Sequence, residues 1–211
     1  MGVGSWIGRL LLATWVLLPV TGSARAADVS PTLAPLLEAG QDELVNRTYV
    51  SPISKPIGEI RLVRRGDATV VQTALYTSML KRVVAEIAGK ESANWPQDRP
   101  GHEDAVRYVD ALKAAQKKIW DSIPNNSRNP SIRQNLLIEF VSSPTAAAVF
   151  LLEYDLEDGP DGVEIHNRRL LTALELSRDY VLRDQTLIVA DNFKVSEDEA
   201  KKLLDEVHPA H

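Results

Sequence analysis

The fold is decided by residues 58–75, GEIRLVRRGDATVVQTAL, and by residues 76–87, YTSMLKRVVAEI, which follow at once. In the first stretch apolar and polar residues alternate, and β-branched residues dominate after Gly66-Asp67. Alternation on both sides of a tight-turn pair predicts a β-hairpin. In the second stretch apolar residues recur every three or four positions instead. This change of period predicts an amphipathic helix that packs on the hairpin.

Working outward, the same two periods assign most of the remaining chain. The predicted elements are a helix over 103–123, extended runs over 136–141 and 146–154, a turn over 155–162, and a strand core over 186–190. Residues 168–183 suit either a helix or a strand, and we favour a strand. Ser196 with Glu199 three residues later forms the capping-box pattern of a C-terminal helix.

Strands that follow one another, rather than strict strand-helix alternation, indicate the α+β class. We expect an antiparallel sheet of hairpins, with two long amphipathic helices packed on one face and a short C-terminal helix. Residues 57–211 would form one such domain. A split into two domains near Asn125 is the alternative interpretation.

The amino terminus has the layout of a secretory signal peptide. Residues 1–9 carry one positive charge, residues 10–20 are almost entirely apolar, and small residues precede a predicted cut after Ala26. The apolar run is too short to span a bilayer, which takes about 20 residues. Residues 1–26 are therefore predicted to be removed during export, and a bacterial periplasm fits best. Residues 27–56 contain four prolines and are interpreted as an arm over the domain, with short helical patterns at 33–38 and 41–46.

Composition excludes several classes of function. The 211 residues contain no cysteine, which excludes disulfides, thiolate nucleophiles and thiolate zinc sites. Without the signal peptide, 22 basic side chains face 29 acidic ones, a formal charge of −7. Such a balance argues against nucleic acid as a partner. No cofactor-binding fingerprint is present, and we expect no cofactor and no membrane span in the mature chain.

One pair of residues has the spacing of a catalytic motif. Ser78 and Lys81 match the Ser-x-x-Lys element of penicillin-interacting serine enzymes, in which one helical turn brings the lysine to the serine as its base. The Lys-Thr-Gly or Lys-Ser-Gly element of those enzymes is missing. The competing interpretation is that Ser78 caps a helix and Lys81 lies on its solvent face. Paired carboxylates could also serve a hydrolase, but sequence does not fix their separation.

Acidic residues gather around the turn at 155–162. Asp155, Glu157, Asp158 and Asp161 are hard oxygen ligands of the kind that calcium favours, although they lack the spacing of an EF-hand. We interpret them as solvated charges at a hairpin tip. The four histidines lack metal-ligand spacing.

Basic and aromatic residues supply the candidates for partner binding. The first set is Arg61, Arg64, Arg65, Arg168 and Arg169, whose guanidinium groups suit anionic partners if the fold brings them together. Trp95 and Tyr49 are candidates for contact anchors. Trp120 is interpreted instead as a core residue.

These observations favour a soluble, non-catalytic periplasmic protein that binds another periplasmic or envelope protein, as an accessory, chaperone-like or inhibitor protein of undetermined oligomeric state. One alternative is an envelope hydrolase that uses Ser78 and Lys81. The other is a carrier of a small ligand or lipid, in which the two helices close a cavity over the sheet. A large apolar cavity beneath residues 76–87 would favour the carrier, and an exposed patch around Trp95 or Tyr49 would favour protein binding.

Overall fold

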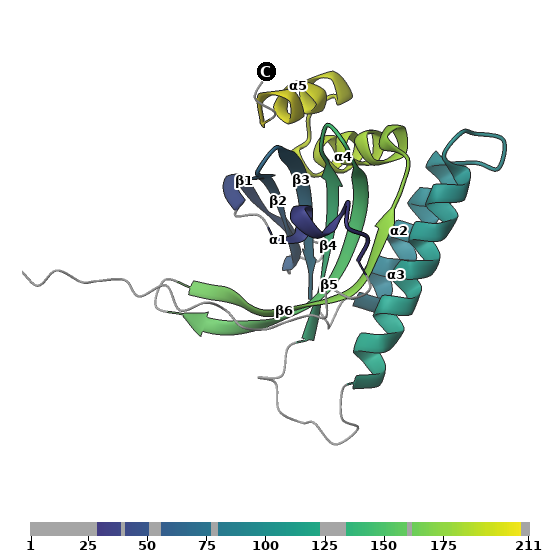
Figure 1. The fold of residues 1–211 in the computed structure, drawn as a ribbon. Helices are drawn as coiled ribbons and strands as arrows, with labels where there is room; N and C mark the ends of the chain where they lie inside the picture. The colour runs from purple at the N-terminus through teal and green to yellow at the C-terminus, as the bar shows by residue number, and fades with distance from the viewer. Residues whose placement is uncertain are drawn as a thin grey trace, which may run out of the picture.

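The computed structural model describes residues 29–38, 41–50, 56–76, 80–122, 134–159 and 162–207. Within these ranges, six strands form one antiparallel sheet in which spatial order follows chain order. The strands are β1 (Gln41–Val50), β2 (Pro56–Arg65), β3 (Ala68–Leu75), β4 (Gln134–Ser142), β5 (Ala147–Gly159) and β6 (Gly162–Glu175). Figure 1 shows the hairpin of β5 and β6 reaching far beyond the other strands. The predicted α+β class is confirmed.

Helices cover one face of this sheet. The helices α2 (Leu80–Asn94) and α3 (His102–Ser122) pack side by side, and α3 contacts β4, β5 and β6 (Figure 1). The helix α4 (Arg178–Phe193) lies against β3, β4 and β5, and α5 (Glu197–Val207) packs on α4. Buried apolar side chains from all four helices and this sheet face form one core. Among the described helices, none combines the length and the apolarity that crossing a bilayer requires.

The opposite face of the sheet has its own, smaller core. The short helix α1 (Ala34–Glu38) covers it, with Leu33 and Leu36 buried against β-strand side chains. Because both faces are covered, β4 directs apolar side chains to both sides: Leu136, Ile138 and Phe140 join the helical core, and Leu137 and Val141 join the smaller one.

A buried ion pair crosses this second face. Arg65 on β2 donates to both carboxylate oxygens of Glu139 on β4, at 2.8 and 2.7 Å, and to the carbonyl of Leu36 at 3.1 Å. Gln72 on β3 donates to Glu139 at 2.8 Å. These bonds tie three neighbouring strands to α1.

Several predicted elements are confirmed. The first hairpin turns at Gly66, whose φ of 60° is the left-handed conformation that glycine adopts at no steric cost. The helix expected over 103–123 is α3, and its expected inward residues Tyr108, Leu112 and Ile119 are buried. The capping box also forms, because Ser196 Oγ and N donate to Glu199 Oε2 while the Glu199 amide donates to Ser196 Oγ. These bonds hold the pKa of Glu199 below its ordinary value.

Four local predictions are wrong in whole or in part. Residues 41–46, read as helical, belong to β1, where pairing with β2 decides the conformation. The helix expected to end near residue 87 continues through Gly89 to Asn94. The strand core expected over 186–190 lies within α4. The strand predicted over 168–183 is right for residues 168–175 and wrong from Arg178, where α4 begins. The apolar run in α4 resembles a strand because the helix is buried against the sheet on one side and against α5 on another.

Candidate functional site

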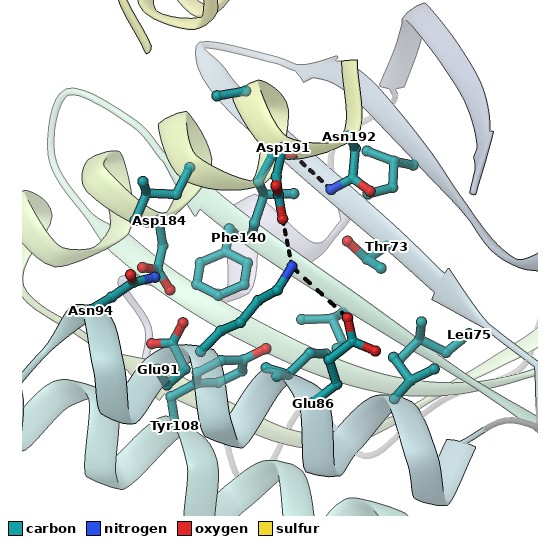
Figure 2. Close-up of a pocket in the computed structure, with 18 of the residues that line it drawn as sticks. Thr73, Leu75, Glu86, Glu91, Asn94, Tyr108, Phe140, Asp184, Asp191 and Asn192 are labelled. Carbon is teal, nitrogen blue, oxygen red and sulfur yellow. Dashed lines mark hydrogen bonds and ion pairs between the residues drawn. The ribbon is translucent and has the colours of Figure 1, made fainter. Parts of the chain in front are cut away.

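A cavity of about 510 Å³ lies between α2, α4 and the helical face of the sheet (Figure 2). Most of its wall is apolar, contributed by β2, β3, β4, α2 and α4. The apolar lining residues are Ile60, Leu75, Val83, Ile87, Tyr108, Ile138, Phe140, Leu187, Ile188, Ala190 and Val195. A space of this size and lining is typical of small-molecule sites in proteins.

Two carboxyl groups meet in the wall of this cavity, Glu91 from α2 and Asp184 from α4 (Figure 2). Their side chains are only 7% and 2% exposed. The Tyr180 hydroxyl donates to Glu91 Oε2 at 2.6 Å, and the Trp95 indole Nε1 donates to Asp184 Oδ1 at 3.1 Å. We call Glu91 and Asp184 the carboxyl pair.

Burial keeps a proton on the carboxyl pair. It raises the pKa of Glu91 from 4.5 to about 8, and the nearby charge of Asp184 raises it further toward that value. Burial also raises the pKa of Asp184, from 3.8 to about 6, against the lowering effect of hydrogen bonds from Trp95, Tyr180 and Glu91. At neutral pH the pair therefore holds one proton and one negative charge, as two carboxyls that share a site do.

One oxygen of the pair needs a hydrogen-bond donor. Asp184 Oδ2 is buried and has no hydrogen-bond partner in the structure. Protonated Glu91 is a donor within hydrogen-bonding reach of Asp184. A donor group on a molecule in the cavity is the other way to satisfy such an acceptor, because a buried acceptor without a partner costs about 1–3 kcal/mol.

Aromatic side chains fix the pair in place. The rings of Trp95 and Tyr180 lie 4.9 Å apart, and Gly101 approaches so closely that a Cβ there would lie 2.7 Å from the Trp95 ring. Gly101 also has a φ of 94°, which side chains rarely tolerate. Burial, together with the charges of the carboxyl pair, raises the pKa of Tyr180 and of Tyr108, so both remain neutral phenols.

The mouth of the cavity is charged. Lys90 bonds to Asp191 of α4 and lies 4.0 Å from Glu86 Oε1, so one α2 lysine bridges to both acids (Figure 2). Glu197, at the start of α5, pairs with Arg183. Of the charged residues that line the cavity, five are acidic and one, Lys90, is basic.

Of the two predicted catalytic residues, the structure describes only Lys81. Lys81 is exposed on α2 and does not line the cavity, and Ser78 lies outside the described residues. The solvent position of Lys81 is the one expected if the Ser-x-x-Lys spacing has no catalytic meaning.

The predicted cation ligands spread along the second long hairpin. Asp155, Glu157 and Asp158 all belong to β5, and Asp161 lies outside the described residues. The side chains of Glu157 and Asp158 are likewise outside the description. Over the ranges that are described, no three acidic or histidine side chains gather as a metal ion would require.

Three of the arginines come together on the face opposite the cavity. Arg65 is buried on Glu139, and the half-buried Arg61 and Arg168 lie close enough to feel the charges of this pair. Arg64 is also half-buried, but as the strand neighbour of Arg65 it belongs to the other face of β2. Burial lowers the pKa of Arg168, the charge of Glu139 raises it, and Arg65 and Arg61 lower it. Arg61 and Arg65 of β2 and Arg168 of β6 thus lie around one carboxylate, that of Glu139. Arg169 is exposed and pairs with Glu153.

The predicted aromatic anchors behave differently from one another. Trp95 is 5% exposed and donates a hydrogen bond to Asp184 of the carboxyl pair. Trp120 is 52% exposed on α3, so its assignment to the core is wrong. Tyr49 lies on β1 opposite Gly58, and its side chain is outside the description.

Sequence reasoning missed the carboxyl pair. A signal was present, because Glu91 continues the buried stripe of α2 four residues after Ile87, and Asp184 lies four residues after buried Tyr180. A carboxylate within an apolar helix stripe is unusual enough to mark a site. Both were overlooked because the first helix was predicted to end near residue 87, and because Asp184 lies between two segments that were predicted to be strands.

No protein-family model and no curated protein matches the chain.

Proposed function

We propose that the mature chain is an exported, non-enzymatic binding protein that holds a small, mostly apolar molecule in the cavity between α2, α4 and the sheet. The observation that carries this proposal is the cavity of about 510 Å³ with its largely apolar wall. It lies beneath α2, through Val83 and Ile87, where a carrier needs its ligand space.

The features expected of a protein-binding surface give less support. Trp95 is buried, so it offers no anchor to a partner. The large apolar side chains that are exposed in the described ranges are Val106, Trp120 and Leu182, which belong to two different helices. Single exposed apolar residues are normal on a protein surface.

Hydrolysis is supported less well than binding. Lys81 is exposed away from the cavity. The carboxyl pair offers an acid and a base, but its two members lie close enough to share a proton. A glycosidase instead keeps its two carboxyls about 5 Å or more apart, so that sugar or water fits between them.

The periplasm remains the proposed location, on the strength of the amino-terminal signal pattern. Expression of the full chain in a bacterium, followed by fractionation, tests this. We expect the protein in the envelope fraction with Ala27 as its first residue. A cytosolic protein that still begins at Met1 would contradict the proposed export.

Binding is tested with a neutral apolar fluorescent probe, N-phenyl-1-naphthylamine, and the purified chain 27–211. We expect saturable fluorescence enhancement. Ile87→Trp fills the cavity and should weaken binding at least tenfold, whereas Val106→Trp adds the same side chain to the exposed face of α3 and should leave binding unchanged. The thermal midpoints of both variants are measured to verify that they fold. No saturable binding, or equal weakening by the two variants, would overturn the proposal.

A further inference from the structure

We propose that the ligand of this cavity is an amphipathic cation, whose ammonium group binds between Glu91 and Asp184. This inference rests on the proposed binding function and specifies its ligand class. An apolar body would occupy the wall formed by the sheet, α2 and α4, and the cationic end would lie at the carboxyl pair (Figure 2).

The first support is an unsatisfied acceptor. Asp184 is 2% exposed, lines the cavity, and has one oxygen, Oδ2, without a donor from the protein. Its other oxygen is already engaged by Trp95 at 3.1 Å, and Tyr180 donates to Glu91 at 2.6 Å. A protonated primary amine has three donors and no acceptor, which complements a pair that offers acceptors in excess of donors.

The second support is the charge of the whole cavity. Its charged lining residues are Glu86, Lys90, Glu91, Asp184, Asp191 and Glu197, five acids against one base. The base, Lys90, is bonded to Asp191 at the mouth, and so it does not offset the charge of the carboxyl pair deeper inside. An anionic ligand such as a fatty acid would be repelled, and a neutral one would leave the pair's charge uncompensated.

Binding of this kind exchanges one cation for another. The ammonium group enters already protonated, Glu91 gives its proton to water, and both carboxylates then accept hydrogen bonds from the ammonium. The net change is one ligand cation bound and up to one proton released. Because acidification restores the proton, affinity falls as pH falls, and the ligand is released in acid.

The other groups that face the carboxyl pair do not reverse the fall in ligand affinity at low pH. Tyr180 and Tyr108 stay neutral, because burial raises the pKa of both phenols. The positive charge of Arg183 on α4 lowers the pKa of Asp184. Among the lining residues, the remaining ionisable groups are Glu86, Lys90, Asp191 and Glu197 at the mouth, and the strands contribute none.

The experiment compares three probes of equal chain length, octylamine, 1-octanol and octanoate, by calorimetric titration into chain 27–211. At pH 8 we expect octylamine to bind at least tenfold more tightly than 1-octanol, and octanoate to bind most weakly. Between pH 8 and pH 6 the octylamine affinity should fall by more than tenfold, since one proton must be displaced. Titration in two buffers of different ionisation enthalpy should register proton release near pH 7.

Variants separate the pair from the rest of the cavity. Glu91→Gln keeps an acceptor for Tyr180 but cannot exchange a proton, so the octylamine affinity should lose its dependence on pH between 6 and 8. Asp184→Asn, a second and independent variant, should lower the ratio of octylamine to 1-octanol affinity. Glu206→Gln, on the exposed side of α5, changes the net charge equally and should behave as the unmodified chain.

The possible failures are distinguishable. If N-phenyl-1-naphthylamine binds but 1-octanol or octanoate binds as tightly as octylamine, the cation inference is wrong and the binding function stands. The same holds if octylamine binds without proton release. If the fluorescent probe also fails to bind, the proposed function itself is wrong.

Discussion

Glu91 gives the protein a dependence of stability on pH that is opposite to that of an ordinary paired carboxylate. Its pKa of about 8 in the folded chain lies above its ordinary 4.5, so folding favours the protonated form. The stability linked to this proton is complete below about pH 4.5 and is lost as the pH rises toward 8. Asp184 acts in the same direction between pH 3.8 and about 6. For Glu91 the loss at pH 7 is on the order of 3 kcal/mol.

We therefore predict that Glu91→Gln removes the part of the pH dependence of folding stability that comes from Glu91. The amide is neutral at every pH and retains an acceptor for Tyr180. Urea unfolding at pH 5, 6, 7 and 8 should show the variant gaining stability relative to the unmodified chain as the pH rises. Glu206→Gln, which alters an exposed carboxylate, should follow the unmodified chain within about 0.5 kcal/mol. A difference between Glu91→Gln and the unmodified chain that is constant from pH 5 to 8 would contradict a raised pKa at Glu91.

At the scale of elements, the ion pair of Arg65 and Glu139 joins β2 to β4, and Arg65 also reaches α1. Both side chains are almost fully buried, at 3% and 0% exposure. Removal of one partner leaves a charge in the interior, which costs about 3–5 kcal/mol. We predict this loss for Arg65→Met. The double variant Arg65→Met/Glu139→Gln should lose less than the sum of the two single variants, with a coupling above about 1 kcal/mol.

A matched comparison exists on α3. Lys117 pairs with Asp121 one helical turn later, and both side chains are exposed, at 76% and 60%. Lys117→Met should cost less than about 1 kcal/mol, because water already screens both charges. Urea unfolding at one pH measures all four variants. Equal losses for Arg65→Met and Lys117→Met would show that burial does not set the strength of the first pair.

Elements whose local pattern agrees with their environment could be predicted from sequence. The first hairpin turns at Gly66-Asp67, where glycine adopts the left-handed conformation, and α5 begins with a capping box. In α4 the local pattern misleads, because Gln185 is buried and bonds to the carbonyls of Thr69 and Phe140 rather than to water. Tertiary contacts of this kind override periodicity and are invisible in a single sequence.

At the scale of the whole molecule, dependence on tertiary contacts explains why the sequence predicted the fold class but not the carboxyl pair. The α+β class follows from the order of elements. The carboxyl pair depends on where α2 and α4 meet, and its hydrogen bond from Tyr180 to Glu91 joins residues 89 positions apart. The sequence suggested a cluster of Arg61, Arg65 and Arg168 only on the condition that the fold brings them together. It did not predict Glu139, the carboxylate at the centre of the cluster.

Because α1 covers the second sheet face, residues 33–38 contribute to the stability of the folded chain. A cut after Ala26 retains Leu33 and Leu36, whose side chains are 2% and 7% exposed over the smaller core. Each buried leucine contributes about 2 kcal/mol, and the Leu36 carbonyl also accepts a bond from Arg65. We predict that chain 39–211 melts on the order of 10 °C below chain 27–211. Within chain 27–211, Leu33→Ala should lower the melting temperature markedly, whereas Pro35→Ala, at an exposed position of α1, should change it little. Scanning calorimetry of these four proteins decides the matter, since equal melting of chains 27–211 and 39–211 would mean that α1 does not stabilise the sheet.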